Sequence, residues 1–209
     1  MVLTSATVSK SVTERIELSL NALITRRGLQ RGIVAELSAH IAIGCCEAVG
    51  ALLNRSHRLI SPLSFAISIT GEVRLLERYH GLDQVNGGEL ISYMAPEYGS
   101  LTIDEQRSDV FVIGIILWEL LSNRKLFSGP TDYHTMELVR EADIPAIPDI
   151  DTQLDTILRI ALAKEPQSRF QNVLVFREAL ASYLASRRRI DVPTELAIAL
   201  AQEPSTSVI

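Results

Sequence analysis

Two runs of sequence decide the fold: Ser-Tyr-Met-Ala-Pro-Glu at positions 92–97, and Arg-Ser-Asp-Val-Phe-Val-Ile-Gly-Ile-Ile-Leu-Trp-Glu-Leu-Leu at positions 107–121. The second run is apolar on nearly every face of a helix that we expect to begin at Asp109. A helix of this kind passes through the middle of a domain, and Asn123 is suited to end it. Gly114 inside the helix costs about 1 kcal/mol relative to alanine, unless close packing requires it.

The segments around this central helix predict further helices and one pair of strands. Residues 32–53 carry apolar side chains at helical spacing, which predicts a long and mostly buried helix. The apolar alternation of residues 65–69 resumes at residues 73–75 after a Thr-Gly turn, which is typical of a small β-hairpin. An irregular, exposed connection is expected at residues 82–90. Shorter helices are expected at residues 19–25, 131–140, 152–164, 172–187 and 193–202.

Length and charge limit the class of protein. The chain has 209 residues, enough for one substantial core but too few for a second full domain. Its formal net charge of -5 provides no basic field of the kind that attracts nucleic acid or anionic membranes. The longest apolar run, residues 110–117, is far shorter than a bilayer span, and the start does not resemble a signal peptide. We therefore expect a cytoplasmic protein with no nucleic-acid or membrane partner.

Cysteines and histidines do not suggest a metal centre. Cys45 and Cys46 are adjacent, so a disulfide between them would be strained, and no zinc-type companion stands at a suitable spacing. They are typical of small apolar residues inside a helix. The four histidines fall in different predicted elements. The sequence therefore predicts no metal site and no cofactor.

With the central helix in place, the chain resembles the C-terminal lobe (C-lobe) of bacterial, eukaryotic-like Ser/Thr protein kinases. Residues 95–97 match the Ala-Pro-Glu motif of that family, and Asp109, Gly114 and Trp118 match the pattern of its central helix. The likeness is strongest over residues 93–184. It implies a mainly α fold, a kinase-like C-lobe with a small hairpin.

The same resemblance implies the domain organisation. We expect a flexible start at residues 1–11, the C-lobe at residues 12–187, and a C-terminal extension at residues 188–209 with a short helix and a frayed tail. No glycine-rich phosphate loop is recognisable, and residues 1–11 are too few for a five-stranded sheet. The N-terminal lobe (N-lobe) is therefore expected to be absent.

Four residues are expected to hold the frame of this lobe. The resemblance implies that Glu97 pairs with Arg169 and ties the activation segment to the helices beneath it. The alternative is that Glu97 and Arg169 are independent surface charges, as most charged residues are. Asp109 is implied to hold the catalytic loop from below, although the helix dipole alone also favours a carboxylate near a helix start. Trp118 belongs to the same central-helix pattern.

Three positions at which the family carries catalytic groups hold other residues here. Leu59 replaces the aspartate of the His-Arg-Asp motif, and a hydrocarbon cannot accept a proton. Ser64 replaces a magnesium-binding asparagine with a poorer oxygen donor. Glu77 replaces the metal-binding aspartate of Asp-Phe-Gly, and the adjacent Arg78 offers its carboxylate an alternative partner. The resemblance therefore implies that catalytic, nucleotide-binding and metal-binding residues are all missing.

These substitutions predict a pseudokinase, a catalytically inactive C-lobe that acts as a scaffold, inhibitor or allosteric regulator in signalling. Its expected partner is another protein, such as a kinase or signalling protein, or a second copy of the chain. We expect the contact to use apolar residues of the long helix and of residues 59–65, which the N-lobe would otherwise cover. One alternative is half of a Ser/Thr kinase that binds ATP only after a separate N-lobe docks. Another is the product of a decayed reading frame that folds without a selected role.

Overall fold

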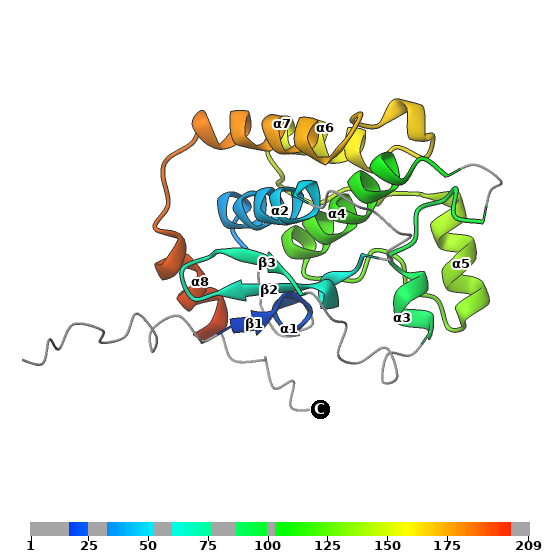
Figure 1. The fold of residues 1–209 in the computed structure, drawn as a ribbon, viewed down its shortest axis with the longest axis horizontal. Coiled ribbons are helices and arrows are strands. Elements are labelled where there is room, and N and C mark those ends of the chain that lie inside the picture. The colour runs from blue at the N-terminus through cyan, green and yellow to red at the C-terminus, as the bar shows by residue number, and fades with distance from the viewer. Residues whose placement is uncertain (1–16, 25–32, 52–59, 77–86, 100–102, 202–209) are drawn as a thin grey trace, which may run out of the picture.

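A computed structural model describes residues 17–24, 33–51, 60–76, 87–99 and 103–201 (Figure 1). This part of the chain is mainly helical with one small antiparallel sheet, as the sequence predicts. The strands are β1 (Glu17–Ser19), β2 (Phe65–Ser68) and β3 (Val73–Leu75). The helices are α1 (Leu20–Ile24), α2 (Ala35–Gly50), α3 (Gly87–Ile91), α4 (Glu105–Ser122), α5 (Asp132–Glu141), α6 (Thr152–Ala161), α7 (Val173–Ala185) and α8 (Val192–Ala201).

Helix α4 is the predicted central helix. It packs against α2, α6 and α7, and every residue from Asp109 to Leu120 is buried (Figure 1). A Cβ atom on Gly114 would lie 3.0 Å from Leu162 Cδ2 and 3.3 Å from Ala161 Cβ. The close approach of the end of α6 therefore explains why a glycine is placed inside a buried helix.

The start of α4 differs from the prediction, whereas its end agrees with it. The side chain of Asp104 accepts a hydrogen bond from the Arg107 backbone N–H at 3.2 Å, so the helix begins at Glu105 rather than at Asp109. Its first turn is polar and partly exposed, which is why the apolar pattern starts too late to reveal it. Asn123 has the left-handed φ of 53° and ends the helix, as predicted.

The helices that follow begin at polar capping residues. Side-chain oxygens of Thr131, Asp151 and Asn172 accept backbone hydrogen bonds at the starts of α5, α6 and α7. Helix α6 ends at Ala161, short of the predicted end at Lys164, because the chain turns there toward a short 3-10 helix. Within the described part of the chain, no helix is long and apolar enough to cross a bilayer.

The sheet has the strand order β1-β2-β3 with antiparallel neighbours. Ile67 in β2 lies opposite Leu18 on one side and Val73 on the other. Strands β2 and β3 form the predicted hairpin, whose turn places Gly71 at a φ of 84°. Strand β1 was not predicted, because three residues are too few to show alternation. A Cβ atom on Gly71 would lie 2.2 Å from Val192 Cγ1, so α8 rests against the hairpin turn.

Helix α3 corrects the prediction of an irregular connection at residues 82–90. Its sequence, Gly-Gly-Glu-Leu-Ile, has a low helix propensity, but it packs against α5, and tertiary packing overrides propensity in such a short element. Residues 82–86 lie outside the described part of the chain.

The apolar face of α2 is covered by the protein itself. The helix packs against α7, α4 and β3, and Leu37 and Ile41 are fully buried. Phe65 at the start of β2 is also fully buried. The expectation that α2 and residues 59–65 offer free apolar surface is therefore wrong for the described residues, since other helices and strands already contact them. Leu59 lies outside those residues.

Candidate functional site

Of the three positions that the resemblance implies have lost a catalytic group, the structure describes Ser64. It ends a short 3-10 helix immediately before β2, and its Oγ accepts a hydrogen bond from the Ser61 backbone N–H at 3.1 Å. This bond is half of a capping box, and Ser64 is only 5% exposed. The hydroxyl is thus buried and used to fix the local turn. Leu59 and Glu77 lie outside the described residues, so their roles stay predictions.

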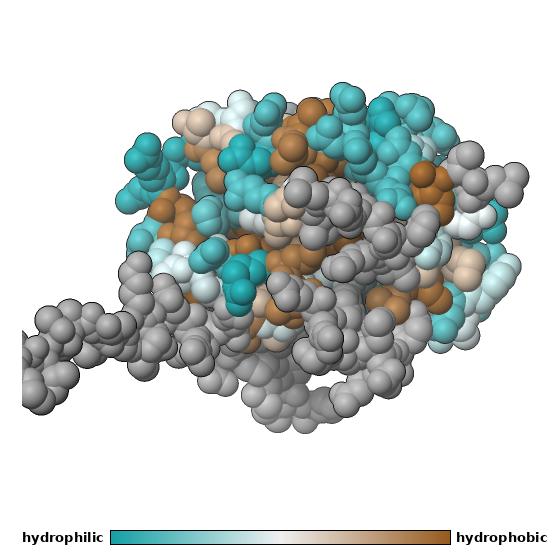
Figure 2. All heavy atoms as spheres, viewed as in Figure 1, coloured by the Kyte–Doolittle hydropathy of each residue, from teal (hydrophilic) through white to brown (hydrophobic). Residues whose placement is uncertain are grey.

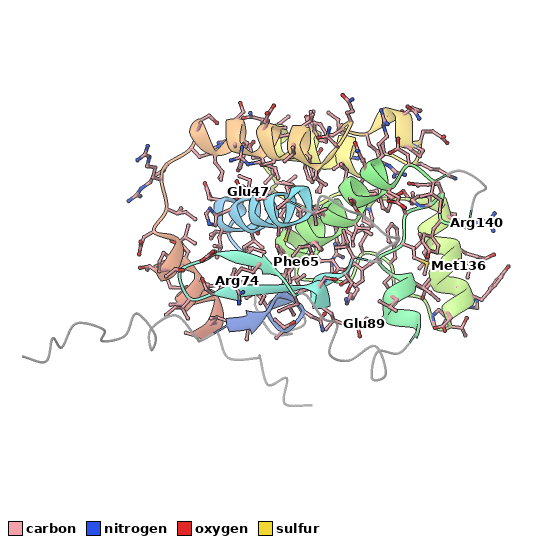
Figure 3. The ribbon with its side chains drawn as sticks, in the orientation of Figure 1. Glu47, Phe65, Arg74, Glu89, Met136 and Arg140 are labelled. Atoms are coloured by element: carbon pink, nitrogen blue, oxygen red, sulfur yellow. The ribbon has the colours of Figure 1, made fainter. Side chains whose placement is uncertain are left out.

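The strands next to Ser64 are closely packed. The Leu76 backbone N–H donates to the Ser64 carbonyl at 2.8 Å, which joins the end of β3 to the start of β2. Residues 65–67 are buried on both faces of β2, whereas Arg74 on β3 is exposed (Figure 3). The described part of the region in which the resemblance places catalytic groups is therefore packed rather than open.

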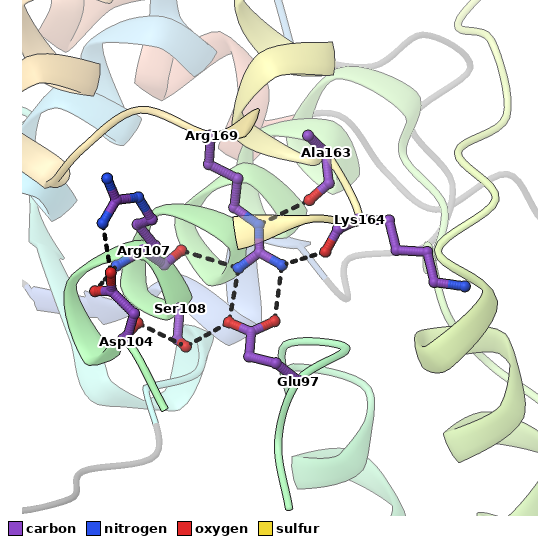
Figure 4. A network of polar contacts seen from close by, with 7 residues as sticks. All are labelled: Glu97, Asp104, Arg107, Ser108, Ala163, Lys164 and Arg169. Carbon is purple, nitrogen blue, oxygen red and sulfur yellow. Dashed lines mark hydrogen bonds and ion pairs between the residues drawn. The ribbon is translucent and has the colours of Figure 1, made fainter. Parts of the chain in front are cut away.

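The structure brings Glu97 and Arg169 together. Nη1 and Nη2 of Arg169 donate to Oε1 and Oε2 of Glu97 at 2.8 and 2.7 Å, respectively (Figure 4). The Arg169 side chain is fully buried and that of Glu97 is 11% exposed. Ser108 Oγ adds a third bond to Glu97 Oε1 at 2.6 Å. A bidentate pair of this kind is among the stronger polar contacts in proteins.

Arg169 also satisfies three backbone carbonyls. It donates from Nε to Ala163 at 2.7 Å, from Nη2 to Lys164 at 2.8 Å and from Nη1 to Arg107 at 3.1 Å (Figure 4). Its guanidinium carbon lies 4.6 Å from the ring centroid of Phe111. One side chain therefore joins the segment that carries Glu97, the start of α4 and the connection from α6 to α7.

An open cleft of about 790 Å³ lies beside this pair. Burial acts to raise the pKa of Glu97, but the hydrogen bonds from Arg169 and Ser108 outweigh it and lower that pKa. Asp104, also in the cleft, forms an ion pair with Arg107. Both carboxylates are thus neutralised by the chain's own cations, which disfavours a metal ion between them. The lining residues are Glu97, Ile103, Asp104, Glu105, Gln106, Pro166 and Gln167.

The two central-helix residues have different surroundings. Asp109 is 9% exposed near the start of α4, and residues 57–59 of the loop that it is expected to hold lie outside the described residues. That role stays a prediction. Trp118 is 2% exposed, and its Nε1 donates to the Pro145 carbonyl at 3.0 Å. The guanidinium of Arg124 lies 5.5 Å from its ring centroid. Trp118 therefore ties the connection between α5 and α6 to the central helix.

A buried carboxylate at the end of α4 was missed by the sequence analysis. Glu119 has no exposed surface, and it accepts hydrogen bonds from the Tyr93 hydroxyl at 2.6 Å and from the Leu126 backbone N–H at 3.1 Å. Lys125 Nζ lies 3.6 Å from its Oε2. Burial raises the pKa of Glu119, although the charge of Lys125 and the bond from Tyr93 act against this. The sequence feature that could have revealed this buried carboxylate is a single acidic residue inside an otherwise apolar run.

The described cysteines and acidic residues do not form a metal centre. In the part of the chain that the structure covers, no group of three or more His, Cys, Asp and Glu residues could hold an ion. Cys45 and Cys46 are free and buried inside α2. Burial raises the pKa of both thiols, which keeps them protonated. They therefore behave as small apolar residues.

Comparison with known proteins indicates one family. Residues 65–177, more than half of the chain, match the model of the family described as protein tyrosine and serine/threonine kinase. Among curated proteins, the chain is 27% identical over 168 residues to the tyrosine-protein kinase MasK of Myxococcus xanthus, an alignment that covers 73% of this chain and 26% of that protein.

Two mycobacterial proteins are also similar. The chain is 25% identical over 186 residues to the serine/threonine-protein kinase PknA of Mycobacterium tuberculosis, which covers 81% of this chain and 41% of PknA. It is 27% identical over 138 residues to PknB of the same species, which covers 59% of this chain and 22% of PknB. The chain thus spans less than half the length of each of these relatives.

Proposed function

Because the chain belongs to the protein tyrosine and serine/threonine kinase family, we propose that it is a catalytically inactive C-lobe that works by binding another protein in signalling. The proposal has two parts, the loss of phosphoryl transfer and the use of the remaining fold as a binding module.

The observation that carries the first part is the environment of Ser64. A magnesium ligand needs oxygen lone pairs directed at the ion, and a serine hydroxyl is shorter than the asparagine amide that the family uses. The Oγ of Ser64 is buried and already accepts the Ser61 N–H. Together with Leu59 and Glu77 in the sequence, this leaves the proposed lobe without its base and without good metal ligands.

The frame of the lobe supports the second part. The bidentate Glu97–Arg169 pair and the buried run of α4 from Asp109 to Leu120 are features of a stable, specifically packed domain. A decayed product would have no reason to keep a buried ion pair whose loss is costly. We therefore infer that the folded lobe itself is the functional unit.

Helix α5 carries the surface that we assign to self-association. Tyr133 and Met136, three positions apart on one side of the helix, are 64% and 44% exposed. Glu137 and Arg140 are also exposed on this helix, which lies at one end of the described fold (Figure 1, Figure 3). In a dimer whose two α5 helices are antiparallel, Glu137 of each chain would form an ion pair with Arg140 of the other chain across the two-fold axis. On the face drawn in Figure 2, hydrophobic and hydrophilic residues are mixed over the whole described surface.

We expect no binding of Mg-ATP by the purified chain. A ligand at a hundred times its Kd stabilises a protein by about 2.7 kcal/mol, which a thermal-shift titration detects as a rise in Tm. The expected Tm is independent of ATP concentration, and no radiolabel should move from γ-labelled ATP to a protein acceptor. A saturable rise in Tm with the isolated chain would overturn the proposal.

The control distinguishes two possible causes of inactivity, the substituted catalytic residues and the lack of an N-lobe. A variant that restores the family residues, Leu59→Asp with Ser64→Asn and Glu77→Asp, is compared with the parent chain in the presence of a separately produced kinase N-lobe. If only the variant transfers phosphate, the three substitutions account for inactivity. If the parent chain also transfers phosphate, it is half of an active enzyme, which is the competing function.

Replacing Met136 with glutamate is expected to abolish self-association. The added carboxylate would have to be desolvated in the dimer and would stand near the partner's carboxylates. Size-exclusion chromatography with light scattering over a range of concentrations measures the mass. The matched control is Ile198→Glu on α8, which is 50% exposed and far along the chain, and should leave the mass unchanged. A parent chain that stays monomeric throughout contradicts the assignment to α5.

A further inference from the structure

The open cleft beside the Glu97–Arg169 pair is not used by the proposed function. One of its walls is the start of α4, and the other is the short 3-10 helix Pro166–Ser168, which lies between α6 and α7 and packs against α4. Its volume of about 790 Å³ falls within the range of about 300 to 1,000 Å³ that is typical of ligand-binding clefts. The cleft is therefore large enough to hold a ligand.

Arg169 holds the two walls at a fixed separation. Its guanidinium donates to the Arg107 carbonyl at 3.1 Å on the α4 side and to the Lys164 carbonyl at 2.8 Å on the other side (Figure 4). The 3-10 wall is closed by a hydrogen bond from the Ser168 N–H to the Glu165 carbonyl at 3.0 Å. A ligand would therefore meet a cleft that is already formed, and its binding would not have to order the walls.

The uncharged lining residues suit a peptide. Ile103 is 38% exposed, and Pro166 faces the same cleft from the other wall. An apolar side chain placed between the two would remove hydrocarbon surface from water. Gln106 and Gln167 also line the cleft, and both are exposed. Each of these side chains carries amide donors and a carbonyl acceptor, so each can pair with a peptide group of a ligand.

The charged lining residues all have the same sign. Glu97, Asp104 and Glu105 line the cleft, and the lining includes no Lys, Arg or His among the described residues. Electrostatic complementarity therefore favours a basic ligand and disfavours an acidic one. Because Glu97 already pairs with Arg169 and Asp104 with Arg107, we assign the contact with a basic side chain to Glu105.

The shape of the cleft favours a peptide over a small molecule. Small-molecule sites enclose most of the ligand and are lined mainly by apolar side chains. This cleft is open, and only Ile103 and Pro166 of its seven lining residues are apolar. An extended chain can enter it and continue past the rim, where further contacts add to the affinity.

We propose that this cleft binds an extended segment of the partner protein in which an apolar side chain is followed by an arginine or a lysine. The apolar side chain would lie between Ile103 and Pro166, and the basic one would lie against Glu105. This inference rests on the proposed function, since it names the kind of segment through which another protein would be recognised.

A peptide titration of the unaltered chain tests the site. The probe is the peptide Gly-Leu-Arg-Gly, acetylated and amidated at its ends, and the readout is the NMR spectrum of the ¹⁵N-labelled protein. The side-chain amide signals of Gln106 and Gln167 should shift in a saturable manner. The peptide Gly-Leu-Glu-Gly should not produce these shifts, because its carboxylate would face the carboxylates of the cleft. Shifts that do not saturate, or equal binding of the two peptides, would show that the proposal is wrong.

Two variants separate the apolar contact from the charged one. Ile103→Ser should raise the Kd of the arginine peptide at least about tenfold, because it removes one wall of the apolar contact. Glu105→Gln should remove the preference for arginine over citrulline, its uncharged analogue. The matched controls are Ile198→Ser and Glu195→Gln on α8, which rests against the hairpin turn, and both should bind as the parent chain does. Unchanged binding in Ile103→Ser, or an arginine preference that survives Glu105→Gln, contradicts the proposal.

Other occupants and the proposed function are tested separately. If Ile103→Ser lowered the mass of the chain in light scattering, the cleft would be a contact between two copies, and the assignment to a partner's segment would be wrong. Phosphate transfer by the parent chain with an added N-lobe would overturn the proposed function and leave the peptide site standing. A chain that transfers no phosphate and binds none of the peptides would overturn only the inference about the cleft.

Discussion

Replacing Arg169 with methionine is expected to lower the free energy of unfolding by about 3 to 5 kcal/mol, the usual effect of removing one partner from a buried ion pair. The change leaves the Glu97 carboxylate with the Ser108 hydroxyl and removes the donor from three backbone carbonyls. Urea denaturation followed by circular dichroism measures the difference. A loss below about 1 kcal/mol, typical of exposed pairs, would contradict the buried geometry.

The pair and its pH dependence provide the controls. Glu97→Met combined with Arg169→Met removes both charges, so the double variant should be less destabilised than the sum of the single variants. The pKa of Glu97 is lowered in the folded protein, so the stabilisation is complete above the pKa of an unfolded glutamate, about 4.3. It is lost as the pH falls through the folded-state pKa. The difference in free energy of unfolding between the parent chain and Arg169→Met should therefore shrink on acidification. If Arg169 stabilised the protein only by apolar packing, this difference would not depend on pH.

The spacing of apolar residues predicted the helical core well, because the buried faces of a helix carry apolar side chains. An apolar run on every face can only belong to a helix that is surrounded, and α4 is surrounded. The sequence did not show whether close packing requires Gly114, since the end of α6 that packs against it is distant along the chain. The predicted starts of α5 and α7, at residues 131 and 172, coincide with the capping residues Thr131 and Asn172, because capping is a local interaction.

The candidate site was predicted only where its residues matched a family motif. Glu97 and Arg169 are 72 positions apart, and no local pattern relates them, so the resemblance alone indicated the pair. Glu119 and Tyr93 were missed because neither periodicity nor the motif distinguishes an acidic residue that points into the core from one that points to solvent. Which elements cover α2 is likewise a property of tertiary packing, so the sequence did not show that α7, α4 and β3 contact this helix.

Replacing Trp118 with alanine is expected to lower the free energy of unfolding by about 3 to 5 kcal/mol, because the indole is buried and its removal leaves a large cavity in the core. The connection between α5 and α6 should loosen most, since it loses the hydrogen bond from Nε1 to the Pro145 carbonyl. Trp118 is the single tryptophan of the chain, so circular dichroism rather than intrinsic tryptophan fluorescence is the probe.

Two further variants separate packing from hydrogen bonding at this position. Trp118→Phe keeps an aromatic ring but loses the indole N–H, so it should cost less than Trp118→Ala while still increasing amide exchange in residues 142–150. Ile198→Ala, at an apolar side chain that is half exposed, should change the free energy of unfolding by less than about 1 kcal/mol. If Trp118→Ala were no more destabilising than Ile198→Ala, the indole would not be part of the core. If exchange in residues 142–150 stayed as slow in Trp118→Phe as in the parent chain, the bond to Pro145 would not be what holds that connection against α4.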